Sequence, residues 1–213
     1  MFTTSYWIPF LIAAFLINIS PGPEMIYVLS RTINSGKKDG LFSALGTGTG
    51  SVIHVLMVAI GLSYILSRSL LAFNIIKILG AVYLIYLGVR AIISRNSQIE
   101  IAKNNDAKIN SPFVSYFKGI LVGILNPHSI IFFLSFLPQF INPDIGGYNM
   151  QIVMLGFITI VMGIIVNMLF IIMVNVAVNP MLKNKIVSGI IDKIMGSILV
   201  FLGLRFLLST YRN

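Results

Sequence analysis

One carboxylate stands out because it lies inside an apolar segment long enough to cross a lipid bilayer. Glu24 ends the stretch Asn18-Ile19-Ser20-Pro21-Gly22-Pro23-Glu24, within a segment that runs from Tyr6 to Leu29. About 20 apolar residues span the hydrocarbon as a helix, and an ionisable group at that depth is costly enough to mark a functional site. The stretch from Asn18 to Glu24 is therefore the first candidate site.

Two prolines in this stretch break the helix that the apolar residues would otherwise form. Pro21 and Pro23 each lack a backbone N–H and crowd the preceding turn. Because lipid cannot replace the lost hydrogen bonds, such a break must face protein or a water-filled cavity. Ser20 provides an N-cap side chain, and Pro21 suits the first position of a new helix. For Pro21 alone, a kink that only shapes the helix is the alternative.

A second break has the same pattern. The apolar segment from Phe113 to Ile141 is interrupted by Asn126-Pro127-His128-Ser129, where an N-cap residue again precedes proline. The free N–H groups and positive dipole of a helix N-terminus favour an anion such as a carboxylate. Carbonyl groups at the ends of the preceding half-helices, together with Glu24, can accept an ammonium group. A pocket between the two breaks therefore suits an amino acid.

The predicted substrate-binding residues come from both breaks: Asn18, Ser20, Pro21, Gly22, Pro23, Glu24, Asn126, Pro127 and His128. Three side chains are candidates for coupling transport to protons because they can exchange one: Glu24, His54 and His128.

Simpler interpretations of several of these side chains remain open. Glu24 can complement the dipole of its own helix. His54 lies among Val, Leu and Met and can be a packing residue instead of a proton carrier. Asn18 can form a hydrogen bond between helices, and for Asn167 that interpretation is favoured.

The composition predicts an integral membrane protein. Hydrophobic residues make up 57% of the 213 residues and charged residues only 10%, far from the balance of a soluble domain. The net charge of +9 does not indicate nucleic acid, because the basic residues fall in short runs between apolar segments. Cysteine is absent and the two histidines have no cluster of carboxylates, so neither a metal site nor a cofactor is predicted.

The hydropathy pattern predicts an all-α fold with six transmembrane helices in a single domain, residues 1–213. A short polar loop, Arg31 to Gly40, follows the first broken span. The remaining spans are predicted at Leu41 to Leu66, Leu70 to Ile93, the broken Phe113 to Ile141, Met150 to Val178 and Ile186 to Ser209. In the second span, Gly46-Thr47-Gly48-Thr49-Gly50 favours close helix packing over a phosphate-binding loop.

Two landmarks recur in the same order in both halves of the chain. The break at Pro21 is matched by the break at Pro127. Lys77-Ile78-Leu79-Gly80 followed by Leu87-Gly88-Val89-Arg90 is echoed, with one gap, by Lys193-Ile194-Met195-Gly196 followed by Leu202-Gly203-Leu204-Arg205. The polar residues 94–111 form a linker between repeat one, about residues 1–93, and repeat two, about residues 112–213. Since each repeat holds three spans, the repeats must be inverted across the bilayer.

The basic residues predict the orientation. The loops after the odd-numbered spans, with their flanks, hold most of them: Arg31, Lys37, Lys38, Arg90, Arg95, Lys103, Lys108, Lys118, Lys183, Lys185 and Lys193. The positive-inside rule places these loops, including the linker, in the cytoplasm and both termini outside. A form with five spans and one re-entrant segment is the alternative.

The motifs together resemble a known family. They are Asn18-x-x-Pro21-Gly22-Pro23-Glu24, the glycine-rich second span, Lys77-x-x-Gly80-Ala81-x-Tyr83-Leu84-x-x-Leu87-Gly88, and Asn126-Pro127 followed by Phe132-Phe133 and Leu137-Pro138-Gln139-Phe140. Over nearly the whole chain they are similar to the lysine exporter (LysE/RhtB) family of amino-acid translocators. The resemblance implies a small multi-pass protein of the bacterial inner (plasma) membrane that exports amino acids, driven by the proton gradient. His128 is a departure, because members of the family often have lysine there.

The predicted function is a secondary transporter that exports amino acids or close derivatives by proton antiport. Its partners are then the substrate, protons and the lipid bilayer, and a homo-oligomer is compatible with the sequence. A small-cation exporter or a passive channel on the same scaffold is the alternative, although a metal route should show more carboxylate, Cys or His within the membrane. An enzyme is not expected, because no nucleophile-base pair or metal motif is present.

Overall fold

The computed structural model describes residues 4–19, 22–93, 111–142, 145–174 and 185–211, and every regular element in these ranges is helical. The elements are α1 (Thr4–Ile19), α2 (Pro23–Ser35), α3 (Lys37–Arg68), α4 (Leu70–Ile93), α5 (Pro112–Ile124), α6 (Pro127–Phe136), the 3-10 helix η1 (Leu137–Phe140), α7 (Tyr148–Met173) and α9 (Lys185–Tyr211). The predicted linker lies outside the described residues except for Ser111, as does the end of the fifth predicted span beyond residue 174.

Several helices are long and apolar enough to cross a membrane. By length and composition, Lys37–Ile65 of α3, α4 and α7 qualify singly, and each of two bent helix pairs qualifies as one broken span, which gives up to five among the described residues. The sixth predicted span corresponds to α9, whose residues Gly196–Leu208 form a shorter apolar helix. A helical membrane protein is thus confirmed, and six spans stay a prediction.

The side chains on the outside of the bundle suit lipid. Large apolar residues such as Ile60, Leu71, Phe157 and Phe201 are each more than 60% exposed. Exposed apolar area of this extent would promote aggregation in water, whereas lipid tails are as apolar as these side chains. These faces therefore meet the bilayer.

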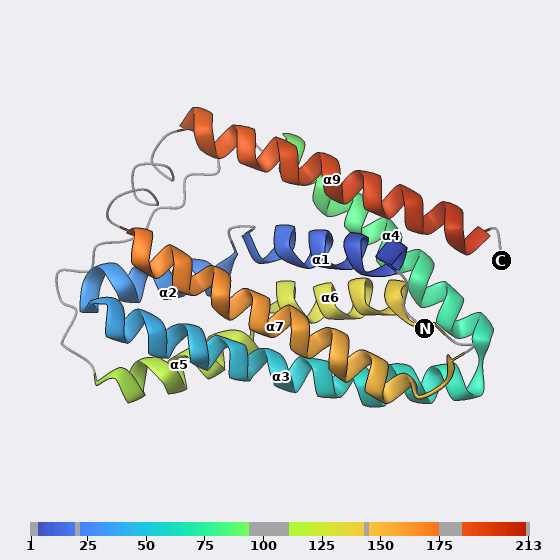
Figure 1. Ribbon diagram of the computed structural model, residues 1–213, viewed down its shortest axis with the longest axis horizontal. Coiled ribbons are helices and arrows are strands. Elements are labelled where there is room, and N and C mark those ends of the chain that lie inside the picture. The colour runs from blue at the N-terminus through green and yellow to red at the C-terminus, as the bar shows by residue number, and fades with distance from the viewer. Residues whose placement is uncertain (1–3, 20–21, 94–110, 143–144, 175–184, 212–213) are drawn as a thin grey trace.

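Both predicted breaks are present as sharp bends. The first pair, α1 and α2, is bent by 52°, and the second pair, α5 and α6, by 54°. Figure 1 shows that α2 and α5 lie toward one end of the molecule's long axis, and α1 and α6 toward the other. The two breaks consequently lie between these ends, beside the continuous helices α3 and α7.

The start of the helix after the first break differs from the prediction. Gly22, with an extended backbone (φ −129°, ψ 176°), is the N-cap of α2, and Pro23 holds the first helical position. The prediction of Ser20 as the cap and Pro21 as the first residue is therefore wrong, and both residues lie outside the described part. Either proline can begin a helix because neither has an N–H to lose, and here the second one does.

The predicted polar loop from Arg31 to Gly40 is also wrong, because only Gly36 separates α2 from α3. Gly36 has a φ of 96°, which glycine adopts without strain. Its N–H donates to the carbonyl oxygen of Thr32 at 3.0 Å and closes the last turn of α2. Polar residues are helical here because their side chains find partners within the bundle.

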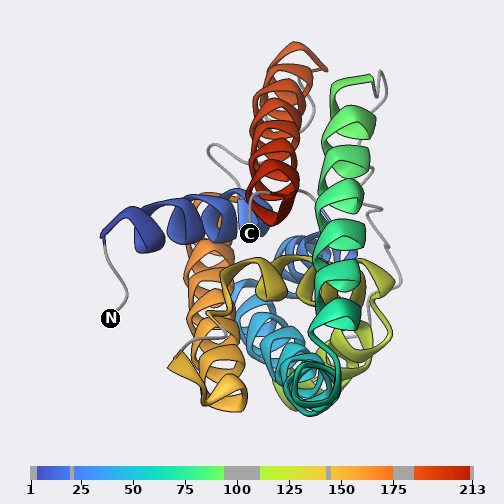
Figure 2. The ribbon, with the colours of Figure 1, turned by 90° about the vertical axis from the view of Figure 1, so that its right-hand side faces the viewer.

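Glycine allows the closest helix contacts, as predicted for the second span. A Cβ added to Gly50 of α3 would lie 2.7 Å from the carbonyl oxygen of Ile120, and one added to Gly123 of α5 would lie 2.7 Å from that of Thr47. Real Cβ atoms do not approach that closely, so α3 and α5 need glycine at this crossing. A second such pair is α4 and α9, where a Cβ added to Gly88 would meet the carbonyl oxygen of Gly196, and Figure 2 shows these two helices side by side.

Candidate functional site

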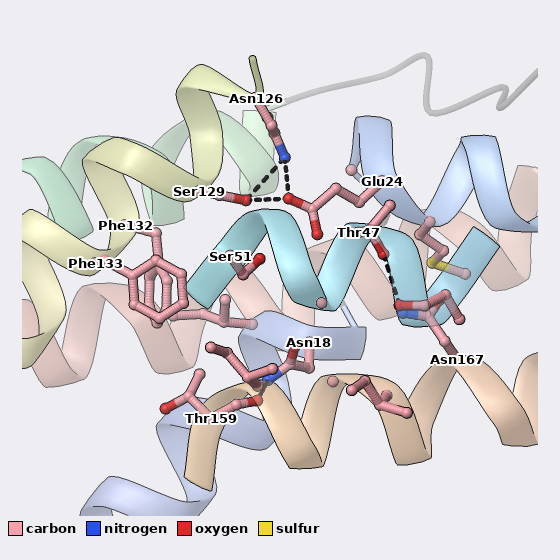
Figure 3. A pocket seen from close by; sticks show the side chains of 18 residues that line it. Asn18, Glu24, Thr47, Ser51, Asn126, Ser129, Phe132, Phe133, Thr159 and Asn167 are labelled. Atoms are coloured by element: carbon pink, nitrogen blue, oxygen red, sulfur yellow. Dashed lines mark hydrogen bonds between the residues drawn. The ribbon is translucent and has the colours of Figure 1, made fainter. Parts of the chain in front are cut away.

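A pocket lies where the two breaks face α3 and α7. Figure 3 shows the side chains that converge on it from α1, α2, α3, α6 and α7. The lining residues are Ile17, Asn18, Gly22, Glu24, Met25, Ala44, Thr47, Gly48, Ser51, Asn126, Ser129, Phe132, Phe133, Thr159, Ile160, Gly163, Ile164 and Asn167. Glu24 is the only charged side chain among these lining residues.

Glu24 is held by two side chains from the opposite break. Asn126 donates from Nδ2 to the Oε1 atom of Glu24 at 2.9 Å, and Ser129 donates its hydroxyl to the same oxygen. Asn126 also donates to the Ser129 Oγ atom at 2.9 Å. Both donors therefore converge on one carboxylate oxygen, while the second oxygen points away from them (Figure 3). That second oxygen is available to a ligand.

The position of Glu24 follows from the helix start. Because α2 begins at Pro23, Glu24 lies in its first turn, where a carboxylate is stabilised by the positive end of the helix dipole. The prediction that Glu24 complements this dipole is thus compatible with a binding role. Asn126 is only 4% exposed, so the contact between the breaks is shielded from water and strong.

Asn18 forms the facing wall and joins α1 to α7. Its Nδ2 atom donates to the backbone oxygen of Ala14 at 2.8 Å and to that of Thr159 at 3.2 Å. The interhelical hydrogen bond proposed for Asn18 from the sequence is therefore confirmed. With both N–H groups used, the amide presents its oxygen as an acceptor, next to the space left by the missing side chain of Gly163.

The structure brings four of the predicted binding residues together at the pocket: Asn18, Gly22, Glu24 and Asn126. Pro23 is exposed at the start of α2 and does not line it. Pro127 and His128 begin α6, but their side chains lie outside the described part, as do Ser20 and Pro21. His54 does not line the pocket and instead contacts the backbone of α5.

The sequence prediction missed the contributions of α3 and α7 and the role of Ser129. Thr47 and Ser51 are four residues apart on α3, and Thr159, Gly163 and Asn167 follow the same spacing on α7. Residues four apart share one face of a helix, so a line of small and polar residues in an apolar span was the available signal. Asn167, expected to be an interhelical residue, lines the pocket.

Comparison with known proteins places the chain in a family. Residues 15–210 match the family model described as LysE type translocator. The chain belongs to this family. It is 31% identical to a protein of Bacillus subtilis (strain 168) named "Uncharacterized membrane protein YrhP", over 93% of this chain and 96% of the relative. No solved structure matches.

Two further relatives of this LysE type translocator carry a functional name. The proteins of Salmonella typhimurium (strain LT2) and Salmonella typhi are each 35% identical, over 77% of this chain and 78% of the relative. Both are named "Homoserine/homoserine lactone efflux protein". Membership of the family makes the chain a membrane transporter and not an enzyme. The pocket is accordingly a candidate for solute binding.

Proposed function

We propose that the protein exports amino acids or close derivatives from the cytoplasm across the bacterial inner membrane, and that the pocket between the breaks binds them. The observation that carries this proposal is the contact between the breaks, where Glu24 accepts hydrogen bonds from Asn126 and Ser129. The single charge of the lining residues thus stands where two discontinuous helices meet, as in transporters built from broken helices.

The groups at the pocket suit the two ends of an amino acid. The second carboxylate oxygen of Glu24 and the amide oxygen of Asn18 accept hydrogen bonds, so together they favour an ammonium group. The N-termini of α2 and α6 favour the carboxylate, or the ester oxygen of a derivative. The names of the two Salmonella relatives support a substrate of this class.

We further propose that six spans form two inverted repeats. The similar bends of 52° and 54° support this arrangement, and so does the pairing of α4 with α9. Gly88 packs against Gly196, and Gly203 packs against Ala81. In the sequence repeat, Gly80 corresponds to Gly196 and Gly88 to Gly203. Exchanging the two repeats therefore turns the contact of Gly88 with Gly196 into a contact of Gly203 with Gly80, one residue away from the observed contact of Gly203 with Ala81. A two-fold axis in the membrane plane has this effect.

The proposed orientation places the junction of α2 with α3 and the start of α5 at the cytoplasmic side. The start of α1 and the end of α9 lie at the same end of the molecule (Figure 1), which fits an even number of spans. In this orientation the basic residues near Gly36 face the cytoplasm.

The proposed source of energy is the proton gradient, which the protein would use by proton antiport. Ionised Glu24 binds the ammonium group, and protonated Glu24 releases it, so proton and substrate compete for one carboxylate. His128 is a second candidate for the group that carries the proton, and a homo-oligomer is compatible with this scheme.

A dipeptide panel tests the exported class. Cells loaded with single dipeptides, with and without the protein, are scored for the amino acid that appears outside. We expect selective export of a small polar amino acid, abolished by a proton uncoupler. If no amino acid of the panel is exported and a metal cation leaves the cells instead, the small-cation exporter is favoured. If amino acids are released only down their gradient and the uncoupler has no effect, a channel is favoured.

A further inference from the structure

We infer that His54 is a positioning residue, which holds the end of α5 and thereby the contact between the two breaks, and that it does not carry protons. This inference rests on the proposed function, because the contact it concerns lines the proposed substrate pocket. It also selects between the two roles that the sequence left open for this histidine.

The geometry defines which ring nitrogen carries the proton. His54 lies on α3 with 1% of its surface exposed. Its Nε2 atom is 3.0 Å from the backbone oxygen of Ile124. A carbonyl oxygen can only accept a hydrogen bond, so Nε2 carries the hydrogen and donates it. In the neutral ring Nδ1 is then unprotonated.

The carbonyl group of Ile124 needs this donor because it is the last residue of α5. The last carbonyl groups of a helix have no intrahelical partner, and here the helix ends within the membrane, where water cannot serve. The next two N–H groups turn back to earlier carbonyls, Leu125 to Leu121 at 2.9 Å and Asn126 to Gly123 at 3.2 Å. Neither of these bonds uses the carbonyl of Ile124, which His54 reaches from α3.

The bond of His54 fixes the residue that contacts Glu24. Asn126 follows Ile124 by two residues, and its side chain donates to Glu24 at 2.9 Å. Gly50, one turn before His54 on α3, brings the two helices close enough for this bond, since a Cβ there would lie 2.9 Å from the backbone nitrogen of Ile124. His54 thus acts on the pocket indirectly, through the backbone between Ile124 and Asn126.

The surroundings of the ring oppose a role as proton carrier. Within the described residues, Nδ1 is buried and has no hydrogen-bond partner, and the ring lies 6.5 Å from that of Phe133. A proton on Nδ1 would place an N–H donor and a charge where no acceptor meets them. A positive charge on His54 would interact with the carboxylate of Glu24. The hydrogen bonds of that carboxylate, however, come from Asn126 and Ser129.

Substitutions distinguish the two roles in proteoliposomes. His54→Gln keeps an N–H donor and cannot carry a proton, whereas His54→Leu removes both. We expect the Gln variant to export with the pH profile of the wild type. The Leu variant should need about five- to tenfold more substrate for half-saturation, as for the loss of one buried hydrogen bond, with its maximal rate less affected. Ser63→Ala removes another buried polar group of α3 that lacks a partner and serves as the matched control.

A spectroscopic measurement tests the inference without relying on transport. The chain has two histidines, so His128→Gln leaves His54 as the only source of imidazole signals. Nitrogen-15 NMR at neutral pH should show the proton of the ring on Nε2 and an unprotonated Nδ1. A proton on Nδ1, or equal loss of pH-dependent export in the Gln and Leu variants, would overturn the inference. If the wild-type protein exports no amino acid, the proposed function fails and the NMR result still decides the role of His54.

Discussion

The two ends of the helix bundle are held together by different chemistry. At the end proposed as cytoplasmic, Arg31 donates from Nε and Nη2 to the Ser115 hydroxyl at 3.2 and 2.9 Å, and that hydroxyl donates to Asp39 at 2.7 Å. Tyr27 donates to the backbone oxygen of Ser115 at 2.9 Å. These bonds join α2 and α3 of repeat one to α5 of repeat two, and Ser115 itself is fully buried.

The other end is held together by aromatic rings. Phe136 of α6 stacks on Phe10 of α1 with centroids 5.6 Å apart, and lies 4.8 Å from Phe132 and 4.9 Å from Phe140. Phe140 in turn meets Phe206 of α9 at 5.3 Å. These contacts depend on shape and area, and each ring has several partners.

The two ends are therefore expected to fail in different ways. A buried charge that loses its partner is left uncompensated, so the polar end is expected to break as a unit. A buried ring that is trimmed keeps most of its neighbours, so the aromatic end is expected to weaken in steps.

Removing the arginine should have the largest effect. Arg31→Leu removes the cation that the Ser115 hydroxyl links to the carboxylate of Asp39, which is 5% exposed. We expect a loss of about 1.5 to 3 kcal/mol in the free energy of unfolding, as for hydrogen bonds to a charged group, measured by unfolding in detergent micelles. Lys38→Leu changes an exposed charge on the same end and is the control. Equal stability of the two variants would mean that the cluster is not a unit.

Trimming the central ring should have a smaller effect. Phe136→Leu retains an apolar side chain among Phe10, Phe132 and Phe140, and we expect a loss of about 1 to 1.5 kcal/mol, assessed by the same unfolding measurement. Phe201→Leu, on a ring that is 66% exposed, is expected to cost about 0.5 kcal/mol or less. A loss at Phe136 as large as that at Arg31 would remove the distinction between the two ends.

Hydropathy predicted the helices well because a backbone within lipid must satisfy its own hydrogen bonds, as a helix does. The third span was expected at Leu70 to Ile93, and α4 is found there, since serine and a polar linker flank this stretch. The junction of α2 and α3 was missed because polar residues were taken for a loop. Arg31 and Asp39 are helical because Ser115, more than 75 residues away along the chain, supplies their partner.

The candidate site was predictable only at the residues that leave a local signal in the sequence. Proline breaks and a carboxylate within the membrane leave a local mark in the sequence, so Glu24 and Asn126 were found. The facing wall at Thr159 and Asn167 comes from a helix distant in the chain, and only the packing of α7 brings it near. The role of His54 depends on a backbone oxygen, which carries no sequence signal at all.

Glu24→Gln tests whether the Glu24 carboxylate receives the ammonium group of an exported amino acid. Purified wild-type and variant proteins are compared for binding of the amino acid found in the dipeptide panel and for its proton-driven export from proteoliposomes. Gln keeps the size of the side chain and can still meet Asn126 and Ser129, so near-normal folding is expected. We predict at least about tenfold weaker binding and loss of proton-driven export, with Glu24→Asp partly active. Unchanged affinity and unchanged pH dependence in the Gln variant would mean that Glu24 does not bind the ammonium group.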